Sequence, residues 1–200
     1  MFKRVVDISA SLTAIVLLAV PMLLIAVAIR LESPGKAVFR QRRAGFRGKA
    51  FTMFKFRTMK ADVNPYGDSP HSSADDRLTK VGRFLRQTSL DELPQLFNVL
   101  AGSMSLVGPR PLYERQAELW DDRQRRRLDV LPGLTGYAQV YGRGELTIEE
   151  KIEMDLHYVE HRNWLLDARI LLRTLTGVLF NRDDIYERQY SRAKERESDS

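Results

Sequence analysis

The sequence predicts an α+β protein that is mostly helical and that associates with a membrane through its amino-terminal end. Three observations predict this class. Residues 8–29 contain no charged side chain and are rich in Leu, Ile, Val and Ala. Two short aromatic runs on either side of Gly45 and Gly48 are typical of a small β-hairpin. Most of the remaining chain has apolar residues at helical spacing, without the alternation of strands and helices that a doubly wound sheet requires.

The composition bounds the possible functions. The 200 residues suffice for one domain with a substantial core. The formal net charge of +6 indicates an anionic partner, such as nucleic acid, a phosphorylated small molecule or an acidic membrane surface. The chain has no cysteine, which excludes disulfides, thiolate nucleophiles and zinc–thiolate sites. Its three histidines lack a familiar metal-ligand spacing, so we do not expect a histidine-based metal site.

The amino-terminal segment is long enough to cross a bilayer, since residues 8–29 would extend about 33 Å as a straight helix. Positive residues lie on both sides of it, and cytoplasmic flanks carry the excess of Lys and Arg. A re-entrant helix–break–helix over residues 1–30 would place both flanks in the cytoplasm, with Pro21 as the break. The alternative is an ordinary single span with a proline kink. The charges slightly favour the re-entrant form.

A basic stretch follows, because residues 30–60 contain ten Lys or Arg residues and one acid. Within it, residues 37–40 and 51–56 are predicted to form the two strands of the hairpin. Lys55 and Arg57 lie two residues apart and therefore share one face of the second strand. This places two cations side by side on the hairpin.

A loop and two short helices are predicted next. Residues 61–75 are rich in Pro, Gly, Ser and Asp and lack periodicity, which favours a loop. The apolar spacing predicts helices over residues 77–87 and 90–100, and Gly102 is expected to end the second helix.

Asp91 and Glu92 are adjacent carboxylates within the stretch TSLDELPQLFNVL. Pro94 is tolerated only in the first turn of a helix, so both should lie near a helix N-terminus. Adjacent carboxylates in a basic chain indicate chemistry on an anionic substrate, because one can attack or accept a proton while the other holds a metal ion. The alternative is structural, since Ser89 and Glu92 fit a capping box and acidic residues in a first helical turn are favourable.

The second half of the chain is predicted to be mainly helical. In VGPRP, two prolines stiffen the backbone at Arg110. Residues 112–130 predict a surface helix with a solvated run of arginines. Residues 131–144 are glycine-rich and irregular, and match neither a Walker loop nor a dinucleotide fingerprint. Residues 146–161 and 163–180 predict two further helices, the second either an amphipathic helix in the membrane interface or a core helix.

Several stretches together resemble one family. FTMFKFRTM, RLTKVGRFLRQTSLDELPQLFNVLAGSMSLVGPRP and PGLTGYAQVYGR occur in this order. They are similar to the bacterial sugar transferases called monotopic phosphoglycosyl transferases, and the length matches the small, PglC-like members. The resemblance covers residues 2–180. It implies transfer of a sugar-1-phosphate from a UDP-sugar to a polyprenol phosphate, such as undecaprenyl phosphate, with release of UMP at the start of glycoconjugate assembly.

The resemblance also implies a site and a cofactor. It implies a Mg²⁺-dependent, ping-pong mechanism with a covalent phosphosugar on an aspartate. Asp91 matches the nucleophile and Glu92 the second member of the dyad, with the metal ion held at this pair and Glu92 as its main ligand. Arg86 matches a phosphate-binding arginine. Further candidates for contacts with the substrate phosphates or the uridine are Arg110 and Arg143, and more weakly Lys55, Arg57 and Asp155. Lys55 and Arg57 could equally contact lipid headgroups, and Asp155 could be a structural acid on a helix face.

Two departures from the family pattern are visible. PglC-like helices often carry Ser-Pro at the break, whereas Val20 precedes Pro21 here, which removes a hydroxyl partner for a freed backbone group. PglC-like enzymes often read GWAQVNGR, whereas this chain has GYAQVYGR at 136–143. Tyr141 in place of Asn is expected to alter contacts with the sugar or the nucleotide.

The resemblance implies a monotopic protein on the cytoplasmic face of the bacterial inner membrane, with membrane lipids rather than nucleic acid as partners. We expect a membrane segment over 1–30, a catalytic domain over 31–180 and a polar, disordered tail over 181–200. The compact form slightly favours an N-acetylated amino-sugar over glucose or galactose, and the oligomeric state is left open.

Two other functions compete with this one. The first is a membrane-anchored module that binds nucleic acid or anionic lipid through the basic, aromatic stretch. It leaves Asp91 and Glu92 unexplained. The second is an inactive scaffold that recruits other proteins, and the intact pair of carboxylates argues against it.

Overall fold

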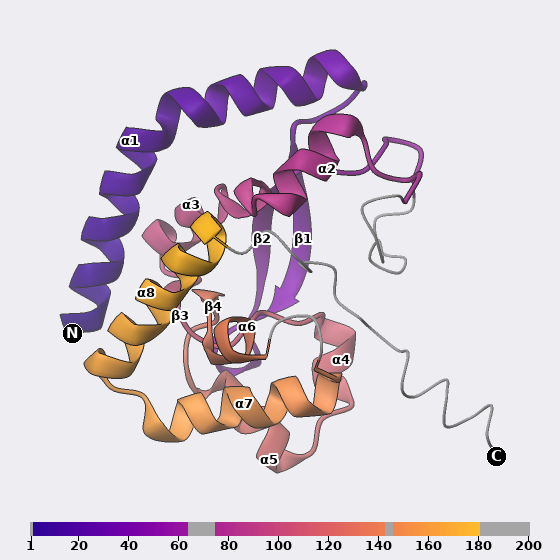
Figure 1. The fold of residues 1–200 in the computed structure, drawn as a ribbon. Coiled ribbons are helices and arrows are strands. Elements are labelled where there is room, and N and C mark those ends of the chain that lie inside the picture. Colours follow the sequence, from indigo (N-terminus) through magenta and orange to yellow (C-terminus); the bar gives the residue numbers. More distant parts are fainter. Residues whose placement is uncertain (1, 64–74, 143–145, 181–200) are drawn as a thin grey trace.

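The computed structural model describes residues 2–63, 75–142 and 146–180. It is mostly helical with two small two-stranded sheets, which confirms the predicted class (Figure 1). The predicted tail, most of the predicted loop and Arg143 lie outside the described residues.

The helices are α1 Phe2–Glu32, α2 Lys80–Gln87, α3 Gln95–Ala101, α4 Glu114–Glu118, α5 Asp122–Arg125, α6 Tyr137–Tyr141, α7 Ile148–His161 and α8 Trp164–Phe180. The strands and 3₁₀ segments are β1 Val38–Ala44, η1 Phe46–Gly48, β2 Ala50–Phe56, η2 Leu90–Glu92, β3 Ser105–Val107, η3 Arg126–Asp129 and β4 Gly133–Thr135.

Helix α1 is bent. It carries Pro21 in its interior, and Figure 1 shows that it changes direction part-way along its length. An interior proline removes a backbone donor and crowds the preceding turn, which is the usual cause of such a bend. The helix is long and apolar enough to cross a membrane, and it is the one such helix among the described residues. Only Asp7, Ser11 and Ile29 are buried in it, so most of its apolar surface faces outward.

The first part of α1 is tied to the body of the protein by charged side chains. Arg4 donates hydrogen bonds to the carbonyl oxygens of Val99 (2.6 Å) and Leu100 (2.8 Å) at the end of α3. Asp7 accepts a hydrogen bond of 3.0 Å from the backbone N–H of Leu106 in β3. These contacts satisfy backbone groups that helix and strand ends leave unpaired.

The other end of α1 is also fixed to the body. Glu32 accepts hydrogen bonds from the backbone N–H groups of Lys80 (2.6 Å) and Val81 (2.9 Å), the first residues of α2. Arg57 donates to the carbonyl oxygen (2.8 Å) and the hydroxyl (2.9 Å) of Ser33, just beyond α1. A carboxylate at a helix N-terminus and a guanidinium at a helix C-terminus both complement the helix dipole. Both ends of α1 are therefore held by the same body.

The hairpin forms as predicted, with a longer first strand. β1 and β2 pair in antiparallel register from Val38 opposite Phe56 to Ala44 opposite Ala50. The prediction ended the first strand at Arg40, where the short aromatic run ends, but cross-strand pairing extends it to Ala44. Alternate residues on the paired strands face opposite sides of the hairpin.

Beyond the hairpin, two predicted helices differ from the structure. The helix predicted over 77–87 begins only at Lys80, where the hydroxyl of Thr79 caps it by accepting from the N–H of Gly82 (2.9 Å). The helix predicted over 90–100 is split into η2 and α3, with Pro94 between them. Proline has no N–H and its ring clashes with the carbonyl of the residue four positions earlier, so a continuous helix does not form.

The second half contains both confirmed and corrected elements. α7 and α8 agree with the helices predicted over 146–161 and 163–180. The single helix predicted over 112–130 is wrong, because Asp121 caps a new helix and divides the segment into α4, α5 and η3. The stretch predicted to be irregular contains β4, which pairs in parallel with β3, and α6. A core of Val107, Tyr158, Val159 and Ile170 joins β3 to α7 and α8.

Candidate active site

Asp91 lies buried in η2, between α2 and α3, with only 8% of its surface exposed. The capping-box alternative is wrong, because Ser89 adopts a left-handed conformation with φ of 56° and its side chain makes no capping hydrogen bond. No hydrogen bond or ion pair to the Asp91 carboxylate is present among the described residues. An unpaired, buried carboxylate is costly, and such groups are rare outside functional sites.

Glu92 lies beside Asp91, and one of its carboxylate oxygens is paired with two cations. Its Oε1 atom accepts hydrogen bonds from Lys55 Nζ (2.8 Å) and Arg110 Nη2 (2.9 Å), and both contacts are ion pairs. Lys55 comes from β2, Glu92 from η2 and Arg110 from the segment after β3. Three elements far apart in the sequence therefore meet at this carboxylate.

The two carboxylates differ in their electrostatics. Burial is the main cause that raises the pKa of Asp91; the charge of Glu92 raises it further, and Lys55, Arg86 and Arg110 oppose the rise. For Glu92, burial alone would also raise the pKa, but the charges and hydrogen bonds of Arg110 and Lys55 lower it to about 2. Glu92 is therefore anionic at neutral pH, whereas folding disfavours the charge on Asp91.

Arg86 lies close enough to Asp91 for its charge to lower the pKa of that carboxyl group. It lies in the last turn of α2, and its Nε atom donates a hydrogen bond of 3.1 Å to the hydroxyl of Thr58. Thr58 follows the hairpin, so one hydrogen bond links α2 to the strand that carries Lys55. Lys55, Arg86 and Arg110 thus surround the two carboxylates with positive charge.

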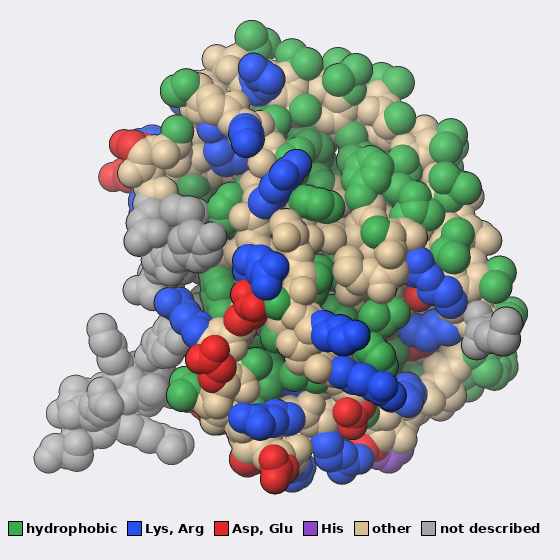
Figure 2. Space-filling view, turned by 180° about the vertical axis from the view of Figure 1, so that it is seen from behind, with side chains coloured by type: hydrophobic (Ala, Val, Ile, Leu, Met, Phe, Trp, Pro, Cys, Tyr) green, Lys and Arg blue, Asp and Glu red, His purple; other side chains and the backbone are tan. Residues whose placement is uncertain are grey.

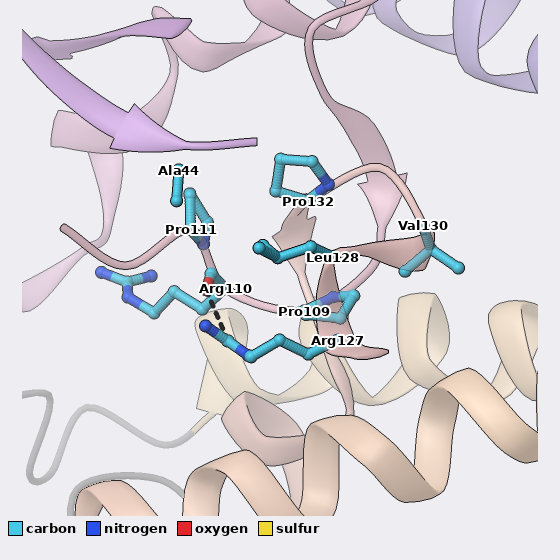
Figure 3. Close-up of a pocket in the computed structure, with 8 residues that line it drawn as sticks. All are labelled: Ala44, Pro109, Arg110, Pro111, Arg127, Leu128, Val130 and Pro132. Atoms are coloured by element: carbon cyan, nitrogen blue, oxygen red, sulfur yellow. Dashed lines mark hydrogen bonds between the residues drawn. The ribbon is translucent and has the colours of Figure 1, made fainter. Parts of the chain in front are cut away.

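The backbone of Arg110 is held by Arg127, a residue that the sequence did not single out. Arg127 Nη2 donates a hydrogen bond of 2.8 Å to the carbonyl oxygen of Arg110. Figure 3 shows this bond beside a small cavity lined by prolines, from which the guanidinium of Arg110 extends away. Arg127 also forms an ion pair with Asp155, and each of the two side chains is 2% exposed. Its guanidinium lies 4.8 Å from the ring centre of Trp120.

Two of the weaker candidates, Asp155 and Arg57, have structural partners, and Arg143 lies outside the described residues. Asp155 is paired with Arg127 beneath the backbone of Arg110 and does not contact the carboxylate pair. Arg57 caps α1 instead of sharing a phosphate-binding face with Lys55. The expectation that Arg127 is part of a solvated arginine run is wrong, and no local signal distinguishes it from its neighbours, since only the fold brings Asp155 to it.

Asp91 and Glu92 are the residues that could hold a metal ion here. No group of three or more His, Asp or Glu side chains suited to a metal occurs among residues 2–63, 75–142 and 146–180. Mg²⁺ is commonly bound through one or two carboxylates, with substrate phosphates and water completing its shell. Two adjacent carboxylates fit that donor set.

We expect Gly82→Ala to disturb the site through the packing of α2. A Cβ atom at Gly82 would overlap the backbone carbonyl of Thr58, so α2 or the chain at Thr58 must shift. The expected loss of stability is about 1–3 kcal/mol, together with lower activity, because Thr58 holds Arg86. Thermal unfolding and a transferase assay measure the two effects. Gln87→Ala at an exposed position of the same helix is the control, and equal effects of both changes would contradict this account.

Comparison with known proteins identifies the family. The family described as bacterial sugar transferase matches residues 1–181. The chain is 42% identical over 177 residues to an uncharacterized sugar transferase, EpsL, of Bacillus subtilis, a match that covers 88% of this chain and 87% of that protein. It is 43% identical over 185 residues to a UDP-glucose:undecaprenyl-phosphate glucose-1-phosphate transferase of Caulobacter vibrioides, covering 88% of this chain and 69% of that enzyme. For the enzyme of the same name from Escherichia coli, the identity is 40% over 183 residues, with 88% and 39% coverage. With nearly its whole length matched, this chain belongs to the bacterial sugar transferase family.

Proposed function

We propose that the protein transfers a sugar-1-phosphate from a UDP-sugar to a polyprenol phosphate and releases UMP, with Asp91 as the nucleophile. The observation that carries this proposal is the Asp91 carboxylate, which is buried and unpaired. It lies next to Glu92, which is paired with Lys55 and Arg110, and near enough to three cations for their charges to act on it. A group that lacks a partner but is surrounded by positive charge suits attack on an anionic phosphorus. Membership in the sugar transferase family supports the same reaction class.

The proposed reaction has two steps. A carboxylate oxygen of Asp91 attacks the β-phosphorus of the UDP-sugar, forming an Asp–O–P bond as the bond from that phosphorus to the bridging oxygen breaks and UMP leaves. An oxygen of the polyprenol phosphate then attacks the same phosphorus, and the Asp91 carboxylate is released. A covalent intermediate lets a soluble donor and a membrane-bound acceptor use one site in turn.

The side chains around Asp91 would stabilise the charges of both steps. Arg86 and Arg110 can each donate paired N–H groups to phosphate oxygens, and Lys55 holds Glu92 in place while adding positive charge. Mg²⁺ held at Asp91 and Glu92 would neutralise charge on the diphosphate, so that an anion can approach an anion. Glu92 suits this role because its low pKa keeps it ionised.

The attachment of α1 supports a re-entrant rather than a spanning helix. Arg4 and Asp7 near one end, and Glu32 at the other, contact the same folded body. A helix that crossed the bilayer would place its two ends on opposite faces, out of reach of a single body. The bend seen in Figure 1 is compatible with entry and exit by the same face.

Exposed apolar side chains indicate which surface would meet the membrane. In Figure 2 they line the upper and right edges of the molecule, where α1 runs, while Lys and Arg side chains gather below them. α8 adds exposed Trp164, Leu165, Leu172 and Leu175. An amphipathic helix of this kind suits the membrane interface. These apolar surfaces support association with a membrane, and we propose that the protein lies on the cytoplasmic face of the bacterial inner membrane.

We expect both ends of α1 to be cytoplasmic. Because the chain has no cysteine, Phe2→Cys and Lys36→Cys each introduce one reactive thiol. A thiol reagent that does not cross membranes should label both variants in inverted vesicles and neither in intact spheroplasts. Labelling of Phe2→Cys in spheroplasts, with Lys36→Cys protected, would establish a true span.

The function itself is tested by UMP release from a panel of UDP-sugars with Mg²⁺ and undecaprenyl phosphate. The two named relatives above are glucose-1-phosphate transferases, so UDP-glucose is the first donor to try, before N-acetylated amino-sugars. Release with one donor that is lost with Asp91→Asn supports the proposal. Full retention of that release in Asp91→Asn would remove Asp91 from the mechanism.

A further inference from the structure

An apolar groove lies between the second part of α1 and the hairpin. It has a volume of about 360 Å³ and is lined by Met22 and Leu23 of α1, Val38 and Arg40 of β1, Phe54 and Phe56 of β2, and Pro94 and Phe97 near α3. This volume lies within the range of about 300–1,000 Å³ that is usual for small-molecule sites. Figure 2 shows apolar side chains inside the bend of α1 with Lys and Arg side chains at their edge.

The hairpin presents one of its faces to this groove. Val38 pairs with Phe56, and Arg40 pairs with Phe54, so these four residues lie on the same face of the two strands. Lys55, between the two phenylalanines, faces the opposite side and reaches Glu92. The same short strand thus builds both the groove and the site of the carboxylates.

Two of the residues that line the groove follow Asp91 at helical spacing. Asp91, Pro94 and Phe97 are spaced three residues apart through η2 and the start of α3. Residues at this spacing lie on one side of a helical segment. Pro94 and Phe97 line the groove, so Asp91 lies one helical step beyond the groove lining on the same side of this segment.

Arg40 gives this apolar groove a positive charge. It is exposed, and its guanidinium lies 5.7 Å from the ring centre of Phe54. No acidic residue among the described parts of the chain forms an ion pair with it. An apolar channel with an unneutralised arginine is complementary to an amphiphile that has an anionic head and a hydrocarbon chain.

We propose that this groove binds the isoprenoid units next to the phosphate of the polyprenyl phosphate acceptor, with Arg40 attracting the anionic head. This assignment rests on the proposed function for the identity of the acceptor. The opening toward α1 would let the rest of the chain remain in the bilayer. The acceptor phosphate would then approach Asp91 past Pro94 and Phe97, after UMP has left.

Leu23 and Leu24 provide a matched test. They are the same residue type on the same helix, are 64% and 63% exposed, and only Leu23 lines the groove. Binding of radiolabelled undecaprenyl phosphate to the full chain in detergent micelles should weaken about tenfold in Leu23→Gln and remain near wild type in Leu24→Gln. The same shift should appear in the KM for undecaprenyl phosphate, while UMP release in the absence of acceptor stays unchanged.

Arg40 has a matched control in Arg47, which is also exposed and lies over a phenylalanine ring but does not line the groove. Arg40→Gln should weaken acceptor binding, and Arg47→Gln should not.

Equal binding by Leu23→Gln and Leu24→Gln would overturn the groove assignment, as would equal competition by phosphatidylglycerol. The binding assay needs no turnover, so its result does not depend on UMP release. If Leu23→Gln alone lost acceptor binding, the groove would be supported even if no UDP-sugar released UMP. The absence of UMP release would reject only the proposed function.

Discussion

Replacing Asp91 with asparagine should abolish sugar-phosphate transfer and make the folded protein more stable. Turnover should fall by about a thousandfold or more, because an amide cannot form the covalent bond to phosphorus. Stability should rise because burial raises the pKa of Asp91, so folding favours the neutral form of this side chain. Asparagine has nearly the same shape and carries no charge.

The gain in stability should depend on pH in a defined direction. The pKa of Asp91 in the folded protein lies above the ordinary value of 3.8, so the ionised group destabilises the fold at neutral pH. Below pH 3.8 the carboxyl group is protonated in both the folded and the unfolded chain, and the advantage of Asp91→Asn should vanish. Thermal unfolding of both proteins from pH 3 to 8 measures this difference.

Glu92→Gln is the matched control and should have the opposite effect on stability. The pKa of Glu92 falls from 4.5 to about 2 on folding, so its charge stabilises the fold above pH 4.5, and this contribution is lost as the pH falls toward 2. At pH 7 the substitution should lower stability by ~3 kcal/mol. If both substitutions destabilised the protein equally, Asp91 would be a structural acid rather than a group held ready for reaction.

The sequence predicted the parts of the site that depend on local pattern. Asp91 and Glu92 are recognisable because adjacent carboxylates precede a proline that must lie near a helix start. The structure brings Lys55, Arg86 and Arg110 to them. Long apolar or strongly periodic segments, such as α1, α7 and α8, were equally predictable. In each case the signal lies within a few neighbouring residues.

Other features were not predictable because they arise from contacts between distant segments. Arg57 has the sequence neighbourhood of a phosphate ligand, yet its guanidinium caps α1. Arg127 lies in a run of arginines typical of a solvated surface, and only the packing of η3 against α7 gives it a buried partner. Asp121 divides a segment whose polarity alone suggested one helix. Spacing identifies residue types suited to a role, but it does not identify their partners.

Replacing Arg127 with methionine should unfold the protein more readily and disable the site. Arg127 and Asp155 form an ion pair that is almost completely buried, so removing one partner leaves an uncompensated charge. The expected loss of stability is about 3–5 kcal/mol. Arg123→Met is the control, since the ion pair of Arg123 with Glu153 also links this region to α7 but is exposed, and its loss should change stability little.

The double variant Arg127→Met, Asp155→Leu separates the contribution of Arg127 to stability from its contribution to the position of Arg110. Burial raises the pKa of Asp155 even beside Arg127, so exchanging the whole pair for apolar side chains should recover most of the lost stability. Activity should not recover, because the carbonyl of Arg110 still lacks the hydrogen bond from Arg127 that holds this segment in place. The expected signature is near-normal thermal unfolding with reduced kcat. Full recovery of kcat in the double variant would show that Arg127 serves stability alone, and that the prolines beside Arg110 suffice to position it.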